Sequence, residues 1–94
     1  MEKITSHGFD EHIRASLLHS GHNFDTEKLN RVRNIFDHAL VTSERHELKR
    51  EHFDEALRNM EEHPEWEHLT EGQREAVVKT FKKHLNIADS AEEN

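Results

Sequence analysis

The 94-residue chain has no cysteine, one proline and only three glycines. Without cysteine there can be no disulfide, no thiolate metal site and no thiol nucleophile. The three glycines, Gly8, Gly21 and Gly72, stand far apart, so no glycine-rich loop is available to cradle a phosphate. These absences exclude several classes of enzyme and leave the redox compartment undetermined.

Long apolar runs are also absent, and apolar side chains make up only 32% of the residues. No segment approaches the roughly 20 apolar residues that a transmembrane helix needs. The N-terminus lacks the basic-then-apolar layout of a signal peptide. We therefore expect no membrane association and a cytoplasmic location. The low apolar content also predicts a thin core, completed by a second copy or by a partner.

Positive charge is scarce, with 13 Lys and Arg against 20 Asp and Glu, for a net charge of −7. Binding to a nucleic-acid backbone needs clustered Lys and Arg, whereas the basic residues here are interspersed with acidic ones. Nucleic acid is therefore not the expected partner.

The apolar residues that are present follow a helical period. Two similar segments, Phe36-Asp-His-Ala-Leu40 and Phe53-Asp-Glu-Ala-Leu57, each place a Phe and a Leu four residues apart on one helix face. No segment alternates apolar and polar residues over several positions, so no strand is predicted. The pattern predicts an all-α, compact four-helix domain, in which helices at about 26–41 and 44–62 form a central hairpin flanked by helices at about 10–20 and 70–86.

Capping signals define most of these boundaries. Asp10, Asp25 or Thr26, and Thr70 with Gln73 mark helix starts. Pro64 ends the third helix, whose start is open between Ser43 and a position near Leu48. We expect one helical domain over 1–88 and a disordered acidic tail over 89–94. The predicted core comprises Ile13, Leu17, Val32, Phe36, Leu40, Phe53, Leu57, Met60, Val77, Phe81 and Leu85.

The segment Val41–His52 can be aligned with the calcium-binding loop of an EF-hand, with Phe53 just after it. Leu48 then takes the central apolar position. Val41, Ser43 and Arg45, however, stand where Asp or Asn ligands are needed, and His52 stands where Glu is needed. Calcium binding is therefore not expected, and we do not assign the chain to that family.

Ten histidines are the most unusual feature of the composition. Imidazole is a common ligand of zinc and similar divalent ions, but no two histidines have the i,i+4 spacing of a helical metal pair. His19 and His22 lie on either side of a predicted helix end. The densest set of candidate metal ligands is Glu62, His63, Glu67 and His68. Most histidines are expected to be exposed polar residues.

The only tryptophan, Trp66, follows Pro64 in a predicted loop. It can pack back onto the core or project as an anchor for a partner. With no catalytic constellation and no cofactor motif, the expected function is that of a non-catalytic protein-interaction module, either an adaptor or a homo-oligomer. The alternative is a histidine-based protein that binds divalent metal or responds to pH.

Overall fold

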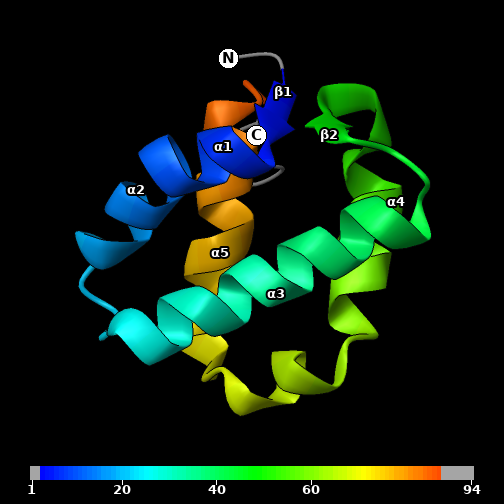
Figure 1. Ribbon diagram of the computed structural model, residues 1–94. Helices are drawn as coiled ribbons and strands as arrows, with labels where there is room; N and C mark the ends of the chain where they lie inside the picture. Colours follow the sequence, from blue (N-terminus) through cyan, green and yellow to red (C-terminus); the bar gives the residue numbers. More distant parts are fainter. Residues whose placement is uncertain (1–2, 88–94) are drawn as a thin grey trace, which may run out of the picture.

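The computed structural model describes residues 3–87 and is mostly helical, with one small two-stranded sheet (Figure 1). The predicted tail at 89–94 lies outside the described residues. The elements in chain order are β1 (Lys3–Thr5), α1 (Ser6–Gly8), the π-helical turn η1 (Phe9–Ile13), α2 (Arg14–Leu18), α3 (Thr26–Thr42), β2 (Glu47–Lys49), the 3₁₀ turn η2 (Arg50–His52), α4 (Phe53–Glu61), the 3₁₀ segment η3 (Pro64–His68) and α5 (Glu71–His84).

The strands β1 and β2 pair antiparallel, and Ile4 lies directly opposite Leu48. Both side chains are buried, at 0% and 1% exposure. The prediction of no strand is therefore wrong, and so is a third helix that begins at 44, because α4 begins only at Phe53. Each strand has three residues, too few to show alternation, and each is stabilised by a partner remote in the sequence.

Ser43, one of the two predicted starts of the third helix, has a different place in the structure. It ends α3 instead of starting a helix, and Glu44 after it has a left-handed backbone (φ +57°). The Ser43 hydroxyl accepts a hydrogen bond from Asn59 Nδ2 at 2.9 Å, and so ties the end of α3 to α4. The second and third predicted helices do pack together as α3 and α4, but β2 occupies the connection between them.

The first helical region also begins earlier than Asp10. Thr5 caps it, since its hydroxyl accepts a hydrogen bond from the Gly8 backbone N–H at 3.0 Å. Asp10 instead forms an ion pair with Arg33 of α3, at 2.6 Å. Two other predicted helix starts are confirmed: Asp25 caps α3, and Thr70 with Gln73 forms a complete capping box on α5.

Three phenylalanine rings form the centre of the core. Phe36 of α3 stacks on Phe9 and on Phe81 of α5, with ring centroids 5.3 Å apart in both pairs. Ten of the eleven predicted core residues are buried, and Leu57 is partly buried. The core also includes residues outside that prediction: Ile4, Phe9, Phe24, Leu29, Ile35, Ala39, Leu48, Ala56, Trp66, Leu69 and Ala76.

The buried core is larger than the thin core that the low apolar content predicted. Among the described residues, only Leu18 and Val41 are large apolar side chains with substantial exposure, at 54% and 76%. In Figure 1, α3 crosses the molecule, with α2 and α5 toward one of its ends and α4 toward the other. No helix in residues 3–87 is long and apolar enough to cross a membrane.

Candidate binding site

The four predicted metal ligands lie around η3. His63 caps this segment through Nδ1, which accepts a hydrogen bond from the Glu65 backbone N–H at 3.1 Å, while its ring lies edge-on to His38. Glu62, Glu67 and His68 are exposed. Across residues 3–87, no three His, Asp or Glu side chains converge closely enough to hold one metal ion. The structure therefore does not bring the predicted four ligands together.

Trp66 belongs to the core, with only 7% of its surface exposed. Its backbone carbonyl accepts a hydrogen bond from Arg74 Nε at 3.1 Å, which joins η3 to α5. An edge of Trp66 and Val78 line a shallow pocket bordered by Glu61, Glu75 and three basic residues. Most of the indole is thus committed to internal packing, and little of it is left to contact a partner.

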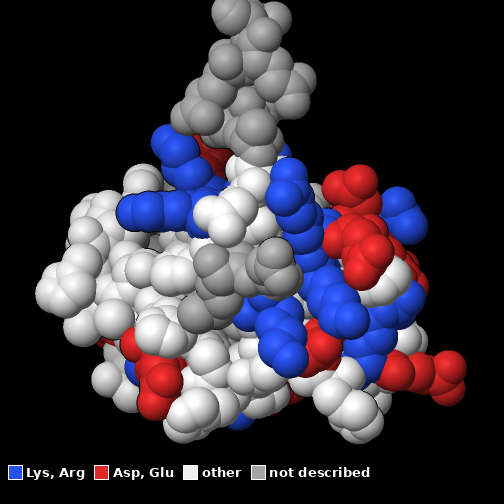
Figure 2. Space-filling model, turned by 90° about the horizontal axis from the view of Figure 1, so that it is seen from above, with Lys and Arg blue, Asp and Glu red and all other residues white. Residues whose placement is uncertain are grey.

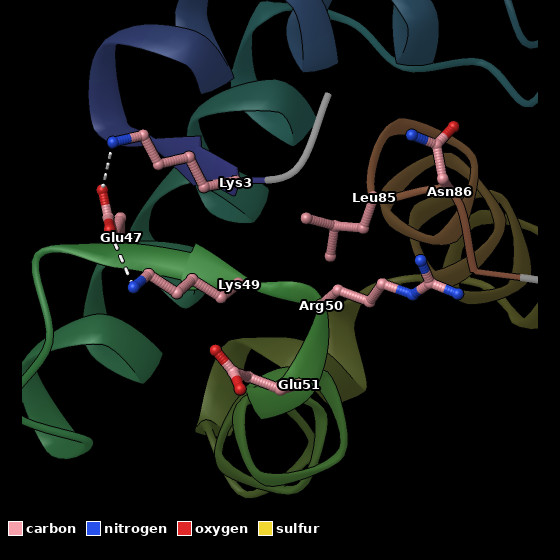
Figure 3. A pocket seen from close by; sticks show the side chains of 7 residues that line it. All are labelled: Lys3, Glu47, Lys49, Arg50, Glu51, Leu85 and Asn86. Atoms are coloured by element: carbon pink, nitrogen blue, oxygen red, sulfur yellow. Dashed lines mark ion pairs between the residues drawn. The ribbon is translucent and has the colours of Figure 1, made fainter.

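A pocket of about 790 Å³ lies where the end of α5 meets the small sheet (Figure 3). At its mouth, Glu47 forms ion pairs with Lys3 at 3.1 Å and with Lys49 at 3.7 Å. The hydrogen bond from Lys3 lowers the pKa of Glu47 below its ordinary value, and the nearby positive charges act in the same direction. Viewed from above, Lys and Arg side chains form a band across this end of the molecule, beside a group of acidic ones (Figure 2). Carboxylates therefore already accompany the basic residues of this pocket.

A second pocket, of about 600 Å³, lies between α2 and α5 and has no carboxylate in its lining. We call it the α2–α5 pocket; it is lined by Ala15, Ser16, His19, Ser20, His22, Ala76, Lys79, Thr80 and Lys83. Two helix faces supply most of these residues. Positions 15, 16 and 19 share one face, and positions 76, 79, 80 and 83 share the other. Ala15 and Ala76 are small, which leaves space between the two helices.

The loop after α2 brings His22 to this pocket. Gly21 and Asn23 both have left-handed backbones, with φ of +82° and +62°, which turn the chain sharply. The buried Gln73 then fixes the loop, since its Nε2 donates to the backbone carbonyls of His22 at 3.0 Å and Asn23 at 3.4 Å. A Cβ on Gly72 would lie 3.0 Å from His22 Nδ1, so the imidazole lies against the first turn of α5.

Another histidine pair lies at the edge of this pocket. His84 Nε2 and the Ser16 hydroxyl are hydrogen-bonded at 3.2 Å, and the His12 ring lies 6.2 Å from the His84 ring. Burial lowers the pKa of His84, and positive charge on His12 and Lys83 lowers it further. His12 comes from η1, and π-helical turns of this kind are frequent near functional sites.

The lowered pKa of His84 gives a testable pH dependence. In the unfolded chain His84 takes up its proton near pH 6.5, before it does so in the folded protein. Its contribution to stability is therefore complete above about pH 6.5 and is lost as the pH falls toward the lowered folded value. We expect His84→Gln to reduce the drop in melting temperature between about pH 7.5 and pH 5.5. His46→Gln, at an exposed position, is the control, and equal pH profiles for wild type and His84→Gln would contradict this assignment.

The sequence placed His19 and His22 on either side of a predicted helix end, but it did not indicate that Ser16, Lys79, Thr80 and Lys83 lie beside them. The helical spacing within each face was visible in the sequence, whereas the pairing of α2 with α5 was not. No protein-family model, curated protein or solved structure matches this chain.

Proposed function

We propose that the protein is a non-catalytic interaction module that binds an acidic segment of a partner protein through the surface formed by α2 and α5. The observation that carries this proposal is the absence of carboxylates from the α2–α5 pocket, in a chain whose net charge is −7. Two lysines and two histidines thus line this pocket with no acidic side chain beside them in the lining.

The lysines of α5 reinforce this argument. Lys79, Lys82 and Lys83 form no ion pair with any carboxylate of residues 3–87. By contrast, Arg14, Arg31, Arg33 and Arg45 each bind at least one carboxylate within the protein. Cations without internal partners remain available to an external anion, and such charges mainly set association rate and specificity.

The absence of a broad apolar surface favours a charged partner over self-association through an apolar face. Leu18 and Val41 lie on different helices and are the only large apolar side chains with substantial exposure in the described part of the chain. We also propose that the module is not an enzyme. Ser16 and His84 resemble a nucleophile–base pair, but within residues 3–87 no carboxylate is bound to the second ring nitrogen of His84.

The test is a fluorescence-anisotropy titration with a dye-labelled polyglutamate peptide at low and high salt. We expect saturable binding that salt weakens, and a loss of about tenfold in affinity for Lys79→Glu with Lys83→Glu. The matched control is Arg50→Glu with Arg58→Glu, because both arginines are exposed, lack ion pairs within the described residues and lie away from the α2–α5 pocket. Equal losses of affinity in the two double variants would show that the peptide is attracted to positive charge anywhere on the protein, which would contradict a specific site. Absence of binding at low salt would also refute the proposal.

A further inference from the structure

We propose that the α2–α5 pocket binds a phosphate group. This inference rests on the proposed function in using the same surface, and it names the chemical group that the pocket recognises. Two observations support it: several lining side chains form no hydrogen bond within the described residues, and these side chains come from different parts of the fold.

Five side chains of the lining have no hydrogen bond or ion pair within the described part of the chain: His19, His22, Lys79, Thr80 and Lys83. The two serines differ, because Ser20 donates to the Leu17 carbonyl at 2.7 Å and Ser16 is bonded to His84. The unused groups comprise two ammonium groups, two imidazoles and one hydroxyl, all of which can donate. An oxyanion bound here would meet donors and no opposing carboxylate.

The donors come from three parts of the fold. His19 follows α2, His22 lies in the loop held by Gln73, and Lys79, Thr80 and Lys83 share one face of α5. A phosphate monoester presents three oxygens in different directions and carries a charge of about −1.5 to −2 at neutral pH. Such a group can accept hydrogen bonds from several directions, which a planar carboxylate with two oxygens does less completely.

The same lining disfavours a metal ion. His19 and His22 are the only histidines among the lining residues, and no carboxylate is there to complete a ligand set. Two nearby ammonium groups would repel a divalent cation but attract a dianion. A phosphate is thus a better match for this lining than a metal ion.

The experiment is a titration of inorganic phosphate into the ¹⁵N-labelled full chain, with chloride replaced so that ionic strength stays constant. We expect saturable shifts confined to His19, His22, Thr80 and Lys83. Lys83→Gln should weaken the affinity about tenfold, since it removes one charged donor. Lys82→Gln is the matched control, because it removes the same charge one residue away, outside this pocket, and it should leave the affinity unchanged.

A second arm distinguishes the source of the phosphate. A phosphoserine peptide that binds at least tenfold more tightly than inorganic phosphate, with shifts in the same residues, would assign the group to a partner chain. Equal affinities would assign the pocket to free phosphate. Non-saturable shifts, or equal losses in Lys82→Gln and Lys83→Gln, would overturn the inference. Binding of phosphate without binding of polyglutamate would refute the proposed function alone, and the reverse would refute this inference alone.

Discussion

Replacing Phe36 with alanine should lower the free energy of unfolding by about 3–5 kcal/mol, the largest effect that we expect from a single substitution. Phe36 is 1% exposed and lies between two other rings, so its removal leaves a cavity that touches Phe9 of η1 and Phe81 of α5. Small domains have total stabilities of roughly 5–15 kcal/mol, so this substitution should remove a large fraction of the total. Urea denaturation followed by circular dichroism measures the change.

Two further variants make this experiment specific. Phe36→Leu retains most of the apolar volume but loses the ring stacking, so we expect a clearly smaller loss than for alanine. Val41→Ala alters an apolar residue of the same helix that is 76% exposed, and its effect should stay within about 0.5 kcal/mol. If Phe36→Ala costs no more than Val41→Ala, the three-ring core is wrong.

Replacing Leu48 with alanine should lower the free energy of unfolding by about 2–5 kcal/mol. Leu48 is 1% exposed and faces Ile4 across the β1–β2 pair, so its truncation empties one half of a buried cross-strand contact. Leu48→Ile keeps the volume and favours an extended backbone, and it should cost less than about 1.5 kcal/mol. Urea denaturation again provides the measurement.

This experiment also decides between the sheet and the helix predicted for 44–62. On the exposed face of a helix, Leu48→Ala would be nearly neutral, because alanine is the best helix former. Leu18→Ala is the control, at a helical position that is 54% exposed. A double-mutant cycle of Ile4→Ala and Leu48→Ala should show a coupling of about 0.5–3 kcal/mol, whereas additive effects would contradict direct pairing.

The candidate site depends partly on local helix geometry and partly on contacts between segments remote in the sequence. The spacing of Ala76, Lys79, Thr80 and Lys83 places them on one helix face, and that much follows from the period of the helix. Nothing in the sequence shows that this face meets the end of α2. The set around His63 and His68 illustrates the converse, because closeness in sequence did not produce convergence in space.

The sequence by itself determined the mostly helical character, the positions of α3 and α5, and about half of the buried core. Each of these depends on residues within one or two turns of each other, such as the Asp25 cap and the Thr70–Gln73 capping box. Only the tertiary structure decided the strands at Ile4 and Leu48 and the juxtaposition of α2 with α5. A three-residue strand has no stability of its own, and two helix faces can pack in many ways, so both features depend on contacts between segments remote in the chain.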